Sequence, residues 1–166
     1  MKFDRDDRAV SIAVTHVLTI GITTVLISGL IIGAGSMLET QQERSTEATL
    51  ETIGERLAGE ISDLDRMADE DETESAVIRT DHQRFASGSQ YTVGLHNSSC
   101  EEYPLINDAD QQCIELTSHG DDVSIAIPLS TETPLDDGVS VTGGQIKLVW
   151  EENGNGNYHI TLEEQR

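Results

Sequence analysis

At 166 residues the chain has room for one domain and an appendage. It carries 31 acidic residues against 10 lysines and arginines, which gives a formal net charge of -21 at pH 7. Such a surface repels nucleic acid and anionic lipid and excludes both as expected ligands, and acidic residues spread through apolar segments favour a salt-adapted folded domain over a disordered tail.

The chain opens with a short charged leader, residues 1–8, followed by residues 9–38, which contain no Asp, Glu, Lys or Arg. As a helix rising about 1.5 Å per residue, the uncharged stretch would span about 45 Å, more than the bilayer's hydrocarbon core of about 30 Å. The sequence therefore predicts a transmembrane helix over residues 9–38, with the lipid bilayer as its partner. A cleavable signal peptide is the alternative, although its apolar region is normally only about 7 to 15 residues long.

The charges that flank the apolar stretch predict its orientation. Lys2, Arg5 and Arg8 precede it, whereas residues 39–43 carry two glutamates and no basic residue. The positive-inside bias then places the N-terminus in the cytoplasm. We expect a single-pass protein of the cell membrane whose C-terminal domain is extracellular.

Three glycines in the apolar stretch are candidates for helix–helix packing. Gly29 and Gly33 form a small-xxx-small pair, and Gly21 lies two turns earlier. Without side chains at these positions a second helix can approach closely. The alternative stays equally open, because glycine is common in membrane helices and such pairs also arise by chance.

A helical period continues beyond the apolar stretch. Apolar residues recur at spacings of three and four at Leu50, Ile53, Leu57, Ile61, Leu64 and Met67. This stripe predicts an amphipathic stalk helix over residues 39–68, which we expect to pack on the protein's own globular part. Gly54 and Gly59 are expected only to weaken that helix. Residues 69–75 then form an acidic linker.

From residue 76 to the end the period becomes two. Six segments alternate or nearly alternate: "QYTVGLH", "CIELTS", "VSIAIPL", "VSVTG", "QIKLVWE" and "NYHITLE". The turn at 153–156, "NGNG", predicts a hairpin across which Trp150 and Tyr158 pair. The predicted fold is therefore α+β: a long N-terminal transmembrane helix continues into the amphipathic stalk helix and precedes a small antiparallel β-sheet domain at 76–166.

The two cysteines, Cys100 and Cys113, are predicted to form a disulfide. In an exported domain a loop of this size makes such a bond worth about 3 kcal/mol. Free thiols are one alternative. A zinc site with His96 and His119 is another, although these spacings lack the close C-x2-C of structural zinc sites. Asn97 opens an N-x-S sequon, so its glycosylation stays open.

No catalytic pattern occurs in the chain. It has no phosphate-binding glycine loop, no G-x-S-x-G elbow, no H-E-x-x-H and no dinucleotide fingerprint. His82 and His159 lie at polar positions and are expected to be exposed. We therefore expect a protein that is not an enzyme and that has no catalytic residue, no cofactor and no bound metal.

The order of these elements resembles that of the type IV pilin-like proteins. A charged leader ends in Arg8-Ala9, Val10-Ser11 opens the apolar helix, and an amphipathic continuation and a β domain follow. The acidic, lysine-poor composition is most similar to the pilin-like proteins of halophilic archaea. The resemblance implies cleavage between Ala9 and Val10 by a prepilin peptidase. It also implies that the apolar helices bundle with those of other pilin-like subunits, as homo- or hetero-oligomers, into a filament core.

Two features depart from that family. Many haloarchaeal pilins read R-G-V-S-P, whereas this chain has Ala9 and Ile12 at the glycine and proline positions. No acidic residue or glutamine follows Val10 within the first turns. Whether the leader is cleaved therefore stays open. The expected function is a membrane-anchored, pilin-like cell-surface protein that serves as a structural or minor filament subunit. The alternative is a non-polymerising single-pass envelope protein with an external binding domain.

Overall fold

A computed structural model describes residues 6–68, 75–98, 100, 103, 106 and 110–165, with side chains from residue 13 onward. The predicted linker, except Ser75, lies outside the described residues. By its contacts the chain divides into two units, residues 1–41 and 42–166. The predicted fold class is confirmed, because one long N-terminal helix with an apolar first part precedes antiparallel β-sheets.

The helix α1 runs from Asp6 to Ala68. The sequence explains its length, because all three prolines lie beyond residue 100 and none interrupts the helical stretch. The backbone is already helical at Asp6, so α1 includes the last residues of the predicted leader.

Eight strands follow α1 in the described residues. Their bounds are β1 Ala76–Asp81, β2 Phe85–Ala86, β3 Ser89–His96, β4 Cys113–Ser118, β5 Ser124–Pro128, β6 Ser140–Thr142, β7 Gln145–Glu152 and β8 Tyr158–Glu164. The six predicted segments correspond to β3 through β8. The prediction missed β1, where Ala, Val and Ile run together without alternation, and β2, which has only two residues.

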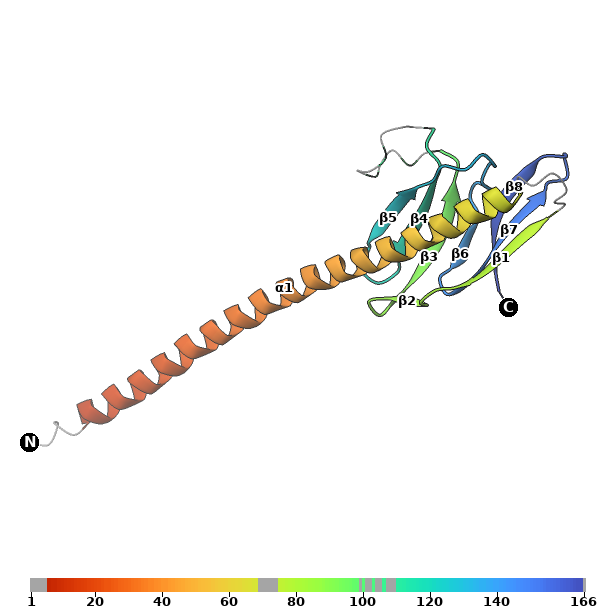
Figure 1. The fold of residues 1–166 in the computed structure, drawn as a ribbon. Coiled ribbons are helices and arrows are strands. Elements are labelled where there is room, and N and C mark those ends of the chain that lie inside the picture. Colours follow the sequence, from red (N-terminus) through yellow and green to blue (C-terminus); the bar gives the residue numbers. More distant parts are fainter. Residues whose placement is uncertain are drawn as a thin grey trace, which may run out of the picture. The chain divides into compact units, whose positions relative to one another are not determined.

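The strands form two antiparallel sheets where the sequence suggested one (Figure 1). One has the order β1-β7-β8, and the other has the order β2-β3-β4-β5 with β6 paired to β3. The expectation of a single sheet was wrong, because β7 and β8 pair with β1 and with each other and not with the strands of the other sheet. In particular, β1 pairs with β7, with Ala76 opposite Trp150 and Thr80 opposite Ile146.

The larger apolar core holds the C-terminal part of α1 against both sheets. Leu57, Ile61 and Leu64 are fully buried and belong to one cluster with Leu116 of β4 and Leu148 of β7. The predicted packing of the stripe on the protein's own domain is therefore confirmed.

Met67 is the exception within the predicted stripe. Its side chain is 47% exposed, and the adjacent Ala68 is buried instead. At about 100° of rotation per residue, Met67 lies about 80° around the helix from Leu57, whereas Ala68 lies within about 20° of it. The exact helical period, and not the three-or-four spacing, decides which residue enters the core.

Gly54 has a packing role that the sequence did not indicate. A Cβ atom there would lie 2.6 Å from Cγ1 of Ile127 and 2.9 Å from Cδ1 of Leu116. The absence of a side chain therefore lets α1 approach β4 and β5 closely. Gly59, by contrast, is exposed and has nothing within 4 Å of its Cβ position.

The expected exposure of His82 is wrong. Its side chain is 2% exposed, and its Nε2 lies 2.7 Å from Oγ1 of Thr80 and 3.1 Å from Oε2 of Glu60. Glu60 comes from α1, so the histidine joins the end of β1 to the helix. A residue just past a strand looks exposed in the sequence, but here α1 covers it. The side chain of His159 is also mostly covered, at 20% exposed.

Tyr91 of β3 is fully buried in the apolar core, and its ring lies against Gly143 in the turn between β6 and β7. Its hydroxyl donates a hydrogen bond to the carbonyl oxygen of Gln83 at 2.7 Å. Gly143 packs directly on its ring, where a Cβ atom would overlap the ring carbons. Burial raises the pKa of Tyr91 from 10.0 to about 12, because the charged phenolate is poorly solvated there.

The predicted hairpin joins β7 and β8 as expected. Oδ1 of Asn153 accepts hydrogen bonds from the backbone N–H groups of Asn155 and Asn157, and Gly156 adopts a φ of 81° that favours glycine. The rings of Trp150 and Tyr158 stack with their centroids 4.0 Å apart and an interplanar angle of 6°. The predicted aromatic pair is therefore confirmed.

Candidate functional site

The first part of α1 is a candidate membrane anchor. Every side chain from residue 13 to residue 38 is exposed, including large apolar ones such as Val25 at 71%, Leu30 at 73% and Ile32 at 74%. A core helix of a soluble protein would be mostly buried, and this segment is not. Among the described residues, α1 is the one helix long and apolar enough to cross a membrane. Its length and composition are those of a single-pass anchor.

Hydroxyl side chains of this segment donate hydrogen bonds to carbonyl oxygens of the helix itself. Thr19, Thr24 and Ser28 each donate a hydrogen bond of 2.8 Å to the carbonyl oxygen four residues earlier. Thr23 donates to the carbonyl oxygens of Thr19 and Ile20. An unpaired hydroxyl costs free energy in hydrocarbon, so this arrangement makes the hydroxyls tolerable there.

The three glycines proposed for helix packing leave open surface on α1. Nothing lies within 4 Å of the Cβ positions of Gly21, Gly29 and Gly33. Gly29 and Gly33 are about 40° apart around the helix and share a face, whereas Gly21 is about 80° from Gly29. Gly21 instead lies among the apolar residues of the 13–26 stretch that line an open groove on the surface of α1.

The residues of the expected processing site lie at the start of α1. Arg8, Ala9 and Val10 have a helical backbone, and their side chains are outside the described part of the chain. The remainder of the leader, residues 1–5, also lies outside the described residues.

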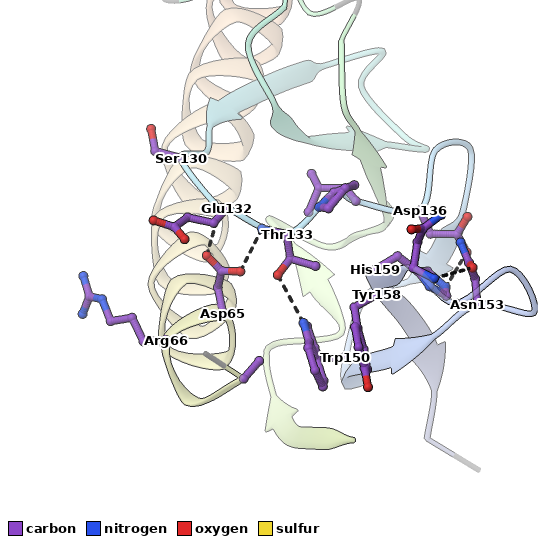
Figure 2. A pocket seen from close by; sticks show the side chains of 15 residues that line it. Asp65, Arg66, Ser130, Glu132, Thr133, Asp136, Trp150, Asn153, Tyr158 and His159 are labelled. Carbon is purple, nitrogen blue, oxygen red and sulfur yellow. Dashed lines mark hydrogen bonds and ion pairs between the residues drawn. The ribbon is translucent and has the colours of Figure 1, made fainter. Parts of the chain in front are cut away.

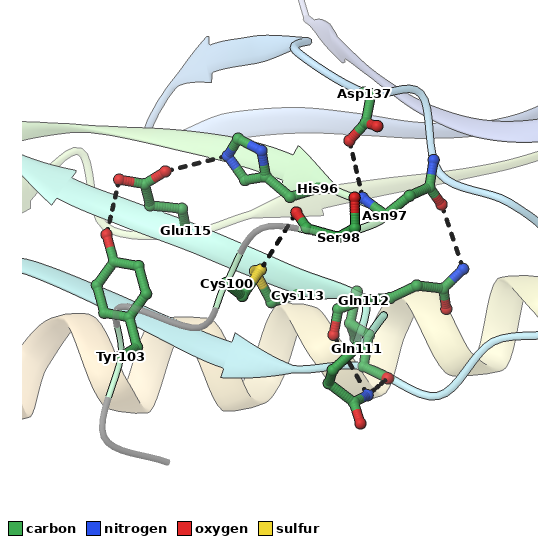
Figure 3. The surroundings of a disulfide bond; sticks show 11 residues. His96, Asn97, Ser98, Cys100, Tyr103, Gln111, Gln112, Cys113, Glu115 and Asp137 are labelled. Carbon is green, nitrogen blue, oxygen red and sulfur yellow. Dashed lines mark hydrogen bonds and ion pairs between the residues drawn. A yellow bond between two sulfur atoms is a disulfide. The ribbon is translucent and has the colours of Figure 1, made fainter. Parts of the chain in front are cut away.

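Cys100 and Cys113 are joined by a disulfide with their Cα atoms 6.5 Å apart (Figure 3). Both residues are buried and form a small second core with Ile106 and Ala126, against which Tyr103 packs. The bond attaches the loop after β3 to the first residue of β4. The described residues contain no cluster of three His, Cys, Asp or Glu side chains that could hold a metal ion.

The zinc alternative is not supported by the surroundings of its two histidines, although His96 of β3 lies opposite Cys113 of β4 in the ladder. Nε2 of His96 lies 3.0 Å from Oε2 of Glu115, and Oε1 of the same carboxylate accepts a hydrogen bond from the hydroxyl of Tyr103 (Figure 3). His119 is exposed just beyond β4. With the two sulfurs bonded to each other, neither is available as a thiolate ligand.

The side-chain amide of Asn97, the sequon residue, holds a loop in place. Its Nδ2 donates to the carbonyl oxygen of Leu135, and its Oδ1 accepts the backbone N–H of Leu135 at 2.8 Å. Nε2 of Gln112 donates to the same oxygen at 3.3 Å. Leu135 in turn forms a parallel bridge with Ile160 of β8. A glycan on Nδ2 would have to break this pairing, so the folded domain uses Asn97 as a structural link.

A pocket of about 950 Å³, which no pattern in the sequence predicted, lies at the C-terminal end of α1 (Figure 2). The last turn of α1, the loop 130–136 and the β7–β8 hairpin line it. Trp150 and Tyr158 bring their stacked rings to its wall, and Asp65, Asp136 and His159 are among its polar side chains. The hairpin and the aromatic pair were predictable, but the loop that completes the pocket was not.

The polar contacts around the pocket are specific. The two carboxylate oxygens of Asp65 accept backbone N–H bonds from Glu132 at 2.9 Å and from Thr133 at 3.1 Å. Nε1 of Trp150 donates to Oγ1 of Thr133 at 3.1 Å. These bonds attach the loop to both the helix and β7, so the pocket's wall is held by the fold itself.

Asp136 and His159 form the other side of the pocket. Oδ2 of Asp136 accepts a hydrogen bond from Oγ1 of Thr161 at 3.1 Å and lies 3.9 Å from Nε2 of His159. An imidazole beside a carboxylate is a common arrangement in catalysis, but the hydroxyl bonded to this pair, that of Thr161, donates to the carboxylate, whereas a nucleophile would give its proton to the imidazole.

Comparison with known proteins gives one match. The model of a family described as "Family of unknown function (DUF7266)" matches residues 5–163. No curated protein and no solved structure matches the chain. The match covers the apolar segment and the β domain together.

Proposed function

The chain belongs to the DUF7266 family, and we propose that it is a membrane-anchored, pilin-like protein of the cell surface that serves as a structural or minor subunit of a type IV pilus-like filament. The observation that carries the proposal is that the two parts of α1 differ in what their apolar side chains contact. Its first part is uncharged and exposed on all sides, and its second part buries an apolar stripe against a β domain. A filament subunit needs both: an apolar helix to assemble in or near the membrane, and a folded domain attached to it.

The exposed segment supports assembly through helix packing. A helix that is apolar all round cannot stay in water, so lipid or other helices must cover it. Gly29 and Gly33 share a face with no side chain, along which another helix can approach closely. In the filament, copies of this segment pack against one another or against those of related pilin-like subunits.

The leader supports the same proposal through its charge and its motif. Lys2, Arg5 and Arg8 keep the N-terminus in the cytoplasm, and the β domain then lies outside the cell. A prepilin peptidase would cut between Ala9 and Val10. The acidic, lysine-poor surface suits the high external salt of a halophilic archaeon, where concentrated cations screen the repulsion.

The decisive experiment measures assembly in native membranes. Replacing Gly29 and Gly33 together by leucine should abolish cross-linked oligomers, because the larger side chains separate the helices. Membrane insertion and the folded domain should remain. Gly35→Leu is the matched control, because Gly35 lies about 160° from Gly33 on the other side of the helix and should leave the oligomers intact.

Two further measurements fix processing and sidedness. Mass spectrometry of the native protein should find Val10 as its first residue. Protease added to intact cells should digest the β domain. A protein that keeps Met1–Ala9 and stays monomeric with or without the glycine substitutions would contradict the filament, and it would then be a non-polymerising single-pass envelope protein with an external binding domain.

A further inference from the structure

The pocket at the end of α1 contains a rigid aromatic surface. Tyr158 is 37% exposed, and its ring stacks on Trp150, which covers one face of the tyrosine and leaves the other uncovered by the indole. The indole itself is fixed by its hydrogen bond to Thr133. Only 4% of the chain's residues are aromatic, so two stacked rings at one pocket are a concentration of this chemistry. A surface held in place before binding loses little entropy when a ligand arrives.

Two of the three carboxylates that line the pocket, those of Asp65 and Asp136, are already engaged by the fold, whereas Glu132 is exposed. Both oxygens of Asp65 accept backbone N–H bonds, and Asp136 is bonded to Thr161 and faces His159. Arg66, the one arginine among the pocket's lining residues, lies 3.6 Å from Asp63. A charged ligand that paired with Asp65, Asp136 or Arg66 would have to compete with these contacts, and the exposed Glu132 would repel an anion, so such ligands are disfavoured.

The groups left to a ligand are mainly neutral and polar. Asn157 is exposed at the edge of the pocket, and the hydrogen bonds of the turn use Oδ1 of the Asn153 side chain and not its Nδ2. Ser130 and Tyr158, which carry hydroxyl groups, are also among the lining residues. Amides and hydroxyls both donate and accept hydrogen bonds. The pocket thus offers an aromatic face beside groups of mixed hydrogen-bonding character.

From this combination we infer that the pocket binds a neutral saccharide. A sugar ring has an apolar C–H face that packs on an aromatic ring, and its hydroxyls both donate and accept hydrogen bonds at the ring's edge. The volume of about 950 Å³ admits more than one sugar unit. The inference does not rest on the proposed filament, because the pocket lies wholly within the unit of residues 42–166.

Trp150 is the chain's only tryptophan, so its fluorescence reports on this pocket alone. The full chain, in a detergent without a sugar headgroup such as lauryldimethylamine oxide and in molar KCl, is titrated with neutral hexasaccharides of glucose, mannose and N-acetylglucosamine. At least one of these saccharides should change the Trp150 emission saturably. In NMR, saturation of the protein's protons should transfer to the ring protons of that saccharide. No saturable response to any of the three would overturn the proposal.

Variants decide whether the response comes from this pocket. Tyr158→Ala should weaken binding at least tenfold, and Asn157→Ala about threefold to tenfold. Asn155→Ala is the matched control, because Asn155 is in the same turn but does not line the pocket, and it should bind like the wild type. Since Tyr158→Ala also removes a packing contact, Asn157→Ala is the safer variant. Equal affinity of Asn157→Ala and the wild type for the saccharide would contradict binding in this pocket.

A cationic probe tests the opposite reading of the pocket. Spermidine should give no saturable change in molar KCl, because Asp65 and Asp136 are engaged and salt screens the charge of the exposed Glu132. Saturable spermidine binding without saccharide binding would replace the sugar with a cationic ligand.

Discussion

Residues 13–38 and residues 46–68 belong to one helix, but they differ in how far their side chains are buried and in where their hydroxyl groups find partners. In the first segment every side chain is exposed, and the hydroxyls of Thr19, Thr24 and Ser28 bond back to the helix's own carbonyls. In the second segment Thr46 is buried and donates across to Oδ2 of Asp121 at 2.9 Å, next to the buried stripe. The first segment therefore pairs its hydroxyl groups within the helix, whereas the second pairs Thr46 with a side chain from another part of the domain.

The difference teaches that surroundings, more than helix propensity, give each segment its role. The first segment has nothing of its own chain to pack on, so its stability in place depends on what covers it. The second is held by the β domain's core. Substitutions that act on one segment and spare the other are therefore the most direct tests.

The largest expected effect comes from truncating the buried stripe. Leu57→Ala should lower the free energy of unfolding of the β domain by about 2 to 5 kcal/mol, because Leu57 is fully buried in the core. Leu26→Ala, at a 62% exposed position of the first segment, should leave it unchanged. Urea unfolding of the full chain in detergent measures both. Equal losses would mean that the two segments are not energetically separate.

Removing the disulfide should act on the domain alone. Cys100→Ser with Cys113→Ser opens a loop of 13 residues' separation, and we expect the domain to lose about 3 kcal/mol while membrane insertion is retained. Thermal unfolding with and without reductant provides the measurement, and the wild type under reductant should match the double variant. A variant as stable as the oxidised wild type would show that the loop is held by packing alone.

Alkaline pH should weaken the domain through Tyr91. Its pKa is raised from 10.0 to about 12 by burial, so between pH 10 and pH 12 the folded state keeps a proton that the unfolded state has lost. The stability present below pH 10 therefore falls by up to about 2 to 3 kcal/mol as the pH rises through 12. Urea unfolding from pH 9 to pH 12 tests this. In Tyr91→Phe this part of the pH dependence should be absent, and an unchanged slope would assign the loss to other groups.

The smallest effects compare two glycines of α1. Gly54→Ala should destabilise the domain by about 1 to 3 kcal/mol, because the new methyl group would meet Ile127 and Leu116. Gly59→Ala should instead stabilise it by about 0.5 to 1 kcal/mol, since that position is open and helical. Differential scanning calorimetry resolves the opposite signs. A stabilising Gly54→Ala would mean that the helix can move away from β4 and β5 at little cost.

The sequence predicted much of the fold because its signals are local. The apolar stretch, the helical stripe from Leu50 to Leu64 and the alternation of β3 through β8 each lie within one short segment. The Cys100–Cys113 pairing and the Trp150–Tyr158 stack follow from equally simple patterns. The pocket could not be predicted, because its wall needs the loop 130–136, and no periodic pattern in that loop points to Asp65 or Trp150.

What the amino-acid sequence determined by itself is the character of each segment: which part of α1 is apolar all round, which part has one apolar face, and where strands alternate. Only the tertiary structure decided how distant segments meet. It paired β1 with β7, buried His82 beneath α1, used Gly54 for close packing and tied Asn97 to Leu135. The physical reason is range: hydrophobic periodicity is encoded by neighbours along the chain, whereas a buried hydrogen bond or a contact between strand and helix depends on partners that folding alone brings together.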